Sequence, residues 1–374
     1  MESLAELKLP FFPIGQGCMG IGGQLQAEKV DEQQQIRAIR FGIDRGLTFL
    51  DTAEVYAEGY SEIILGKAIQ GIRDKVFLAT KFSPENNGYS EVIAAAEGSL
   101  RRLGTDYIDL YQAHWPNPRV PIYETMSALA ELVSSGKVKH VGISNFSKRE
   151  MIEAQEILPS QKIYSNQLEY NLFDRFVEYE ILSYCKQINS LLIAYSPLDR
   201  GRNGNSHPAN ELLSELSKKY DKTNSQLSLN WLVSRGNVVP IPKATNLKHI
   251  EENASSLDFQ ISSEDIDRIN NAFDSNPQLI PTNEINVSVS GEGGRKVYRS
   301  KTEAIENKLG LSPSPLELAE FIRAGDLTKP VRLVKRIDKA KGLKYDLIEG
   351  RLRYWAWVLA FNGEKPVPAY VRYM

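Results

Sequence analysis

The chain has 374 residues, which is long for one ordinary domain but leaves room for an α/β barrel of about 250 residues and a second module. With 42% hydrophobic and 25% charged residues, it has the composition of a globular protein, which excludes an intrinsically disordered chain. No run of about 18 apolar residues occurs, so we expect no membrane partner.

The cysteines and the N-terminal sequence indicate where the protein works. Cys18 and Cys185 cannot form a disulfide framework, and residues 1–15 lack the cationic and apolar regions of a secretory signal, so we expect a cytoplasmic protein. Neither the two cysteines nor the four histidines have metal-ligand spacing, which predicts no metal site.

Short β-rich runs alternate with amphipathic helical patterns through residues 1–275. The expected strands are FFPIG, LTFLD, VFLATK, YIDLYQAH, VKHVGIS, YSNQLEY, LLIAYSPL and VVPIPK. Between them, patterns such as QQQIRAIRFGIDRG and EVIAAAEGSLRRLG have apolar residues at i, i+3 and i+4 and end at glycine. Eight such units with right-handed crossovers predict a closed (β/α)8 TIM barrel of the α/β class.

The first glycine-rich stretch, GQGCMG at residues 15–20, matches the G-x-G-x-x-G fingerprint of dinucleotide-binding Rossmann folds. That fingerprint has its function only where a helix starts inside it and holds the pyrophosphate. Here IGGQLQAEKV follows, with another glycine pair and no capped helix start. We therefore interpret the stretch as a flexible turn after the first strand.

The amino-acid composition changes after Asp274. The segment SNPQLIPTNEINVSVSGEGGRK is rich in Pro, Asn, Ser and Gly. We expect a linker at 276–290 and a small α+β domain at 291–374, with helices at SPLELAEFIRAG and RYWAWVLAF and strands at KPVRLVKRI, KYDLIEG and VPAYVRYM. Residues 285–374 carry 17 Lys and Arg against 10 Asp and Glu, whereas residues 1–284 carry 28 against 37. These opposite charge balances favour two modules with different partners.

Four polar side chains fall where predicted strands end. Asp51 ends LTFLD, Tyr56 lies in the loop after it, Lys81 ends VFLATK, and His114 ends YIDLYQAH. A buried ammonium beside a phenol lowers the pKa of the phenol, and the ammonium itself needs a carboxylate to stay charged away from water. The set therefore predicts a proton-delivery site, in which Asp51 holds Lys81, Lys81 tunes Tyr56, and His114 orients a substrate oxygen.

These residues resemble the aldo-keto reductase family, through DTAEVYAEGYSE, ATKF, YQAHWPN, GISNF, AYSPL and IPKATNLKHIEEN in the family's order. The resemblance covers about residues 1–275 and implies Asp51, Tyr56, Lys81 and His114 as the catalytic tetrad, with Tyr56 as proton donor. It also implies hydride transfer from a nicotinamide to a small carbonyl substrate, an aldehyde or a ketone. Trp115 and the loop LDRGRNGNSHPAN are expected to wall the substrate pocket.

The same resemblance assigns residues to the nicotinamide end of the cofactor. Ser144 and Asn145 of GISNF, with Gln167 of SNQLEY, would hydrogen-bond the carboxamide. Tyr195 of AYSPL would stack on the nicotinamide ring and leave one face open. A turn cap at Ser144–Asn145 and core packing by Tyr195 are the alternatives.

The phosphate and adenine ends are assigned in the same way. Lys243 and the following helix N-terminus would hold the phosphates, and Glu252 and Asn253 would face the adenine. His249 stands where many members of the family have Arg for the 2′-phosphate, and Lys243 or Lys248 would have to replace it. NADPH is the expected cofactor, and NADH stays an alternative.

The basic C-terminal part, from about residue 285, resembles a ParB/sulfiredoxin-like domain in ELAEFIRAG, PVRLVKR and YDLIEGRLRYWAWVLAFNGEKPVPAYV. In its motif Gly350, Arg351 and Arg353 would bind a phosphate at a helix start. Arg351 occupies the position of the sulfiredoxin cysteine, so sulfinic-acid repair is not expected, and Leu352 also departs from the family. Binding of ATP or another nucleotide is the first interpretation, nucleic acid the second, and an inert docking domain the third.

Two hypotheses for the whole protein follow. In the first, the barrel is a working carbonyl reductase that the C-terminal domain regulates or localises. In the second, the barrel is a redox sensor that binds NADPH, turns over slowly and signals to a nucleotide- or DNA-binding tail. The complete tetrad favours the reductase.

Overall fold

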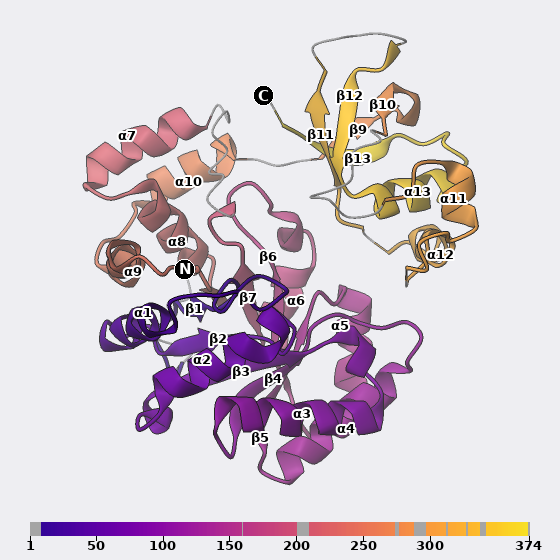
Figure 1. Ribbon diagram of the computed structural model, residues 1–374. Helices are drawn as coiled ribbons and strands as arrows, with labels where there is room; N and C mark the ends of the chain where they lie inside the picture. Colours follow the sequence, from indigo (N-terminus) through magenta and orange to yellow (C-terminus); the bar gives the residue numbers. More distant parts are fainter. Residues whose placement is uncertain are drawn as a thin grey trace. The chain divides into compact units, whose positions relative to one another are not determined.

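The computed structural model describes residues 9–158, 160–199, 209–273, 277–287, 297–311, 313–326, 328–336 and 342–372. The chain divides into two compact units, the first of residues 1–203 with 211–273 and the second of residues 204–210 with 274–374 (Figure 1). Most of the expected substrate loop, the two ends of the expected linker and the start of the expected C-terminal domain lie outside the described residues.

The strands in the described part of the first unit form one parallel sheet, paired in chain order from β1 to β8. The amides of Gly15 and Gly17 donate to the carbonyls of Pro240 and Pro242 at 2.9 and 3.1 Å, so the sheet closes on itself. The predicted (β/α)8 barrel is therefore confirmed. Its strands are β1 (Gln16–Gly17), β2 (Phe49–Asp51), β3 (Phe77–Phe82), β4 (Ile108–Ala113), β5 (Val138–Ser144), β6 (Ile163–Glu169), β7 (Leu191–Tyr195) and β8 (Val238–Pro240).

Helices lie outside these strands (Figure 1), and the helix in EVIAAAEGSLRRLG ends at a glycine as expected. Asp31 caps the first by accepting from the amide of Gln34, and Gly104 ends the third in a left-handed conformation with φ of 63°. The helices are α1 (Glu32–Asp44), α2 (Tyr60–Ile69), α3 (Tyr89–Leu103), α4 (Ile122–Ser134), α5 (Lys148–Ile157), α6 (Ile181–Gln187), α7 (Asn210–Tyr220), α8 (Asn224–Ser234), α9 (Leu247–Ala254) and α10 (Ser263–Ala272).

Aromatic side chains fill the N-terminal end of the barrel. The ring of Phe11 lies 4.8 Å from that of Phe49 and 4.7 Å from that of Phe77. The prediction that FFPIG forms the first strand is wrong, because β1 starts only at Gln16 and Phe11 instead packs across the strand starts. Pro13, which has no backbone N–H to donate to a strand ladder, explains this difference.

The second unit contains a mixed sheet in the order β10-β12-β11-β13-β9. Part of the expected linker belongs to it, because Ile280 of β9 and Ile285 of β10 are buried with Val331, Leu333 and Leu347 in one apolar cluster. The elements are β9 (Gln278–Ile280), β10 (Ile285–Asn286), α11 (Lys301–Ile305), α12 (Pro315–Arg323), β11 (Val331–Lys335), β12 (Tyr345–Glu349), α13 (Arg351–Ala360) and β13 (Val367–Arg372). The capping box expected at SPLE starts α12.

Candidate active site

Two strand ends and the segments that follow two strands bring the four tetrad side chains to the C-terminal end of the barrel. Asp51 and Lys81 lie on β2 and β3, Tyr56 lies in a 3-10 helix after β2, and His114 directly follows β4. Successive strand residues point to opposite faces, so Asp51, two residues after the buried Phe49, shares its inner face. Lys81 on β3 follows the same rule. The Lys81 ammonium lies 5.1 Å from the centre of the Tyr56 ring, and the rings of Tyr56 and His114 are 5.8 Å apart, edge to face.

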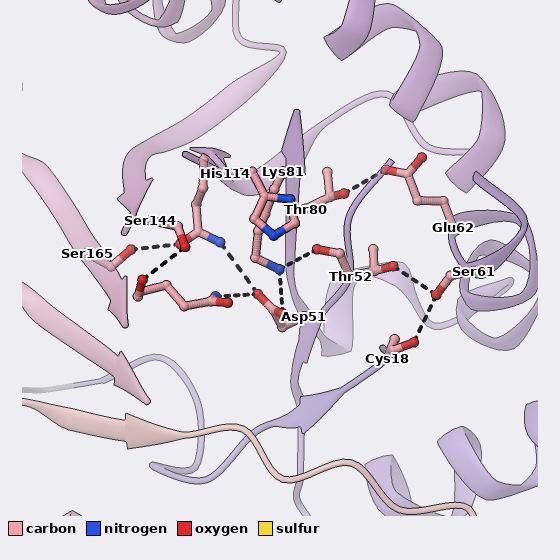
Figure 2. Close-up of polar contacts among 12 residues, drawn as sticks. Cys18, Asp51, Thr52, Ser61, Glu62, Thr80, Lys81, His114, Ser144 and Ser165 are labelled. Atoms are coloured by element: carbon pink, nitrogen blue, oxygen red, sulfur yellow. Dashed lines mark hydrogen bonds and ion pairs between the residues drawn. The ribbon is translucent and has the colours of Figure 1, made fainter. Parts of the chain in front are cut away.

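Lys81 is held in place by two hydrogen bonds (Figure 2). Its Nζ donates to Asp51 Oδ1 at 2.6 Å and to the Thr52 carbonyl at 2.7 Å. The side chains of Lys81 and Asp51 are 0% and 2% exposed. Burial lowers the pKa of Lys81, but Asp51 and Tyr56 outweigh it, so the pKa lies above its ordinary value and the ammonium stays charged.

The phenol of Tyr56 is also buried, with 8% of the residue exposed. Burial raises its pKa above the ordinary value, although the charge of Lys81 and a hydrogen bond from it lower the pKa. Lys81 thus lowers the pKa of Tyr56 as expected, but the loss of hydration outweighs this effect, and the net pKa is raised. Tyr56 is thus fully protonated at neutral pH and has a proton to give.

His114 is neutral at physiological pH. Burial, and secondarily the charge of Lys81, lower its pKa from 6.5 to about 3. Its position is fixed by the backbone, since its amide donates to the Phe82 carbonyl at 3.1 Å and its carbonyl accepts from Asn145 Nδ2 at 3.0 Å. A neutral imidazole keeps one N–H, so His114 is able to donate a hydrogen bond to an oxygen beside Tyr56.

Two glutamine amides hold the second oxygen of Asp51. Gln167 Nε2 donates to Asp51 Oδ2 at 2.7 Å, and Gln112 Nε2 donates to the same oxygen at 3.5 Å. Ser165 Oγ donates to Gln112 Oε1 at 3.3 Å. Gln112 was not among the site residues expected from the sequence. It stands two residues before His114 in YIDLYQAH, and this spacing on a strand was the available signal for a shared inner face.

The residues assigned to the nicotinamide meet on neighbouring strand ends. Ser144 Oγ donates to the Gln167 carbonyl at 2.9 Å, Asn145 Nδ2 to Ser144 Oγ at 3.0 Å, and the Tyr195 hydroxyl to Asn145 Oδ1 at 3.1 Å. Asn145 has a left-handed backbone with φ of 63°, which asparagine tolerates better than most residues. These amides and hydroxyls form a polar rim beside the tetrad.

The residues assigned to the phosphates and adenine follow β8. Lys243 is exposed and lies beside the glycine turn after β1, because a Cβ on Gly20 would come within 3.5 Å of Lys243 Cε. Asn246 caps α9, on which His249 is exposed, Glu252 half-buried and Asn253 buried. No helix starts within GQGCMG, and α1 begins only at Glu32, as the rejection of the Rossmann fingerprint required. The motif is not simply a turn after the first strand, however, because its Gln16–Gly17 form β1 and only its end, at Met19 and Gly20, is a turn.

The phosphate motif of the second unit is only partly as expected. Gly350 is the left-handed cap of α13 with φ of 97°, and a Cβ on it would meet Arg353 Nη2 at 2.8 Å. Arg351, however, is 3% exposed and donates through Nη2 to the Leu347 carbonyl at 2.8 Å. Its guanidinium points into the unit. Gly350 is buried as well, and Arg353 is half-buried, so Arg353 is the most accessible of the three residues.

Among the residues that the structure describes, no helix is long and apolar enough to cross a lipid bilayer. In the same part of the chain, no three His, Cys, Asp or Glu side chains gather closely enough to hold a metal ion. The barrel site instead joins a protonated phenol, a charged lysine and a neutral imidazole. Such a set of side chains is typical of enzymes that use general acid catalysis.

Comparison with known proteins gives the family. Residues 13–274 match the aldo/keto reductase family, and the chain belongs to it. It is 36% identical over 261 residues, 70% of this chain and 90% of the relative, to methylglyoxal reductase YeaE of Escherichia coli. The protein is accordingly an NAD(P)H-dependent oxidoreductase.

Solved structures agree with this assignment. The thermostable aldo-keto reductase Tm1743, solved with the inhibitor epalrestat, is 35% identical with a TM-score of 0.67 and covers 70% of this chain and 95% of its own. An aldo/keto reductase from Klebsiella pneumoniae in complex with NADP and acetate is 35% identical with a TM-score of 0.64, over 70% of this chain and 91% of its own. In both cases the matched fraction of this chain, 70%, is about the fraction that belongs to the first unit.

Proposed function

We propose that the barrel reduces the carbonyl group of a small aldehyde or ketone to an alcohol, with NADPH as reductant. The observation that carries the proposal is the buried, protonated Tyr56 beside the charged Lys81. The bound coenzyme supplies the reducing equivalent. Tyr56 donates its proton to the carbonyl oxygen, the Lys81 ammonium stabilises the phenolate that remains, and His114 donates a hydrogen bond that orients the oxygen.

The donor set at the strand ends fits a nicotinamide dinucleotide. Ser144, Asn145 and Gln167 offer amide and hydroxyl groups of the kind that bind a carboxamide, and Tyr195 offers an aromatic ring next to them. The exposed cation of Lys243 precedes the N-terminus of α9, which is an arrangement suited to phosphates. Similar proteins from Klebsiella pneumoniae were solved with NADP and with NADPH, which supports the same cofactor here.

The preference for NADPH over NADH rests on the residues of α9. His249 is exposed, as is Lys248, whose Nζ lies 3.9 Å from Glu252 Oε1 in a loose surface pair. In the proposal Lys243 or Lys248 supplies the positive charge for the 2′-phosphate, and Glu252 and Asn253 face the adenine. Lys248→Ala distinguishes the two lysines: weaker NADPH binding at low salt with unchanged NADH binding assigns the charge to Lys248, and unchanged binding of both cofactors assigns it to Lys243.

The substrate class proposed first is the small α-oxoaldehyde, because the E. coli relative is a methylglyoxal reductase. Trp115 follows the catalytic imidazole directly and is 49% exposed, so it offers an apolar wall beside the site. Consumption of NADPH, followed by its absorbance with methylglyoxal, aromatic aldehydes, ketones and quinones, tests the proposal. Tight NADPH binding without turnover of any of them would instead favour the redox-sensor alternative.

The cysteines support a reducing compartment, which is the cytoplasm in this proposal. Cys18 and Cys185 are both free and buried. Burial raises the pKa of each thiol to about 12, so neither forms the thiolate that redox chemistry needs at neutral pH.

For the C-terminal unit we propose a ParB/sulfiredoxin-like domain that binds the phosphates of a nucleotide at Gly350 and Arg353. The support is the left-handed Gly350 at the start of α13, with Arg353 lying against it. Titration with ATP, CTP and duplex DNA at two salt concentrations tests this. Saturable nucleotide binding that Arg353→Ala abolishes supports the proposal, and a steep salt dependence with DNA favours nucleic acid.

A further inference from the structure

The loop that carries Tyr56, residues 53–60, has a backbone that needs outside support. Ala57, Glu58 and Gly59 are consecutive left-handed residues with φ of 49°, 55° and 87°, and this conformation is strained for residues other than glycine. The amides of Ala57 and Glu58 donate to the carbonyls of Gln24 and Leu25 at 2.8 and 3.2 Å, so one side of the loop is held by backbone.

Arg102 of α3 holds the other side. A Cβ on Gly59 would lie 2.7 Å from Arg102 Cδ and 2.9 Å from its Nε, so the arginine side chain packs directly on the loop backbone. Its Nε donates to Glu62 Oε2 at 2.6 Å, just after the loop, and its Nη2 lies 3.9 Å from Glu54 Oε2 within the loop. One guanidinium thus bridges two carboxylates on either side of Tyr56 in the sequence.

Both carboxylates are themselves tied to β3 and the loop that follows it. Glu62 is completely buried and accepts a hydrogen bond from Thr80 Oγ1 at 2.6 Å (Figure 2). Glu54 Oε1 accepts from the Ser83 amide at 2.6 Å and from Asn86 Nδ2 at 2.7 Å. Thr80 directly precedes Lys81 on β3. The strand that holds Glu62, and through it the Tyr56 loop, is therefore the same strand that carries the Lys81 ammonium.

We propose that Arg102 is a positioning residue for catalysis, which fixes the distance between Tyr56 and Lys81 by clamping Glu54 and Glu62. The inference rests on the proposed role of Tyr56 as proton donor. Arg102 acts through these two carboxylates and the backbone of Gly59. Its loss should let the strained loop relax and move the phenol relative to the ammonium, and a misplacement of about 1 Å costs on the order of 10²-fold in rate.

The test compares Arg102→Met with Arg101→Met, which removes the same charge one residue earlier on the exposed side of α3. We expect Arg102→Met to lower kcat about 10- to 100-fold, with KM and the Kd for NADPH changed less than about threefold. We expect the alkaline limb of its pH profile to move, because the pKa of Tyr56 depends on Lys81. Arg102→Lys keeps the charge but cannot reach two carboxylates at once as the guanidinium does. Its kcat should therefore lie between those of wild type and Arg102→Met.

The double variant Arg102→Met with Glu62→Gln separates positioning from stability. The glutamine removes the buried charge left without its partner and still accepts from Thr80, so it should restore stability to urea. It should not restore kcat. Recovery of wild-type kcat would make Arg102 only a counter-ion and overturn the inference, as would an unchanged kcat in Arg102→Met. If the wild-type protein and Arg101→Met themselves reduce no carbonyl, the proposed function has failed instead.

Discussion

Lys81 Nζ lies 2.6 Å from Asp51 Oδ1, and the two side chains are 0% and 2% exposed. Without its carboxylate, an ammonium in this place would lose its hydration and gain nothing in return. The Thr52 carbonyl and the Gln167 amide complete the hydrogen bonds of the pair. Protein groups alone thus fix the position of the Lys81 ammonium, which lies 5.1 Å from the centre of the Tyr56 ring.

Asp51→Asn should break this pair and leave the ammonium unbalanced. Removing one partner of a buried pair costs about 3–5 kcal/mol in the free energy of unfolding, and carbonyl reduction should fall with it. Glu97→Gln is the matched control, because Glu97 binds Lys137 at 2.8 Å on the surface, where both side chains are more than a third exposed. That change should cost far less, because water screens an exposed ion pair. Urea unfolding of both variants measures the difference, and equal costs would show that the Asp51–Lys81 pair is not desolvated.

The low pKa of His114 makes stability depend on pH. In the unfolded chain this histidine binds a proton below about 6.5, whereas in the folded protein it does so only below about 3. Between these values the unfolded state binds more protons, so stability is lost as the pH falls through this window, by at most about 1.4 kcal/mol per pH unit for one group. His114→Gln should remove that part of the slope.

Urea unfolding of wild type and His114→Gln at pH 5 and pH 7.5 measures this effect. The pKa of His140 is also lowered, chiefly by burial, but its contribution is present in both proteins and cancels in the comparison. An identical pH slope in the two proteins would mean that folded His114 titrates normally.

Gly142 makes room for the amide that holds Asp51. A Cβ at this position would lie 2.7 Å from Gln112 Cγ and 2.9 Å from Ser165 Oγ. Gly142→Ala should therefore push Gln112 away from Asp51, lower kcat and destabilise the barrel by about 1–3 kcal/mol, as overpacking does. Gly136→Ala is the control, since its φ is 74° but no atom would lie within 4 Å of the added Cβ. It should lose stability through backbone strain and keep kcat; equal kcat in both variants would exclude a role for the Gln112 contact.

The meeting of the four tetrad side chains could be predicted from the sequence because each of them lies at the end of a predicted strand or in the loop that follows it. Parallel strands in a barrel end on one face, so side chains at the ends of LTFLD and VFLATK meet whatever the register. Gln112 and Arg102 could not be found in the same way. Their roles depend on which strand or helix lies beside them, and nothing local in YIDLYQAH or SLRRLG shows that Gln112 reaches Asp51 or that Arg102 reaches Glu54.

Three further features of the structure could not be predicted from the sequence, because each depends on the surroundings of a single residue or short segment. The net pKa of Tyr56 follows from the balance between burial and one ammonium, and sequence shows the ammonium but not the burial. Arg351 at the start of α13 was expected at the surface, yet its side chain turns inward to the Leu347 carbonyl. The apolar Ile280 and Ile285, in a segment rich in Pro and Asn, join the second sheet rather than a linker.

The most direct test is Tyr56→Phe, which removes a single hydroxyl from the site and keeps the ring between Lys81 and His114. NADPH binding, measured by fluorescence quenching, and the rate of carbonyl reduction in a single turnover are compared with those of wild type. We predict an unchanged Kd for NADPH and a rate lower by on the order of 10²- to 10⁴-fold. A Tyr56→Phe protein that binds NADPH and reduces the carbonyl at the wild-type rate would contradict the proton-donor role of Tyr56.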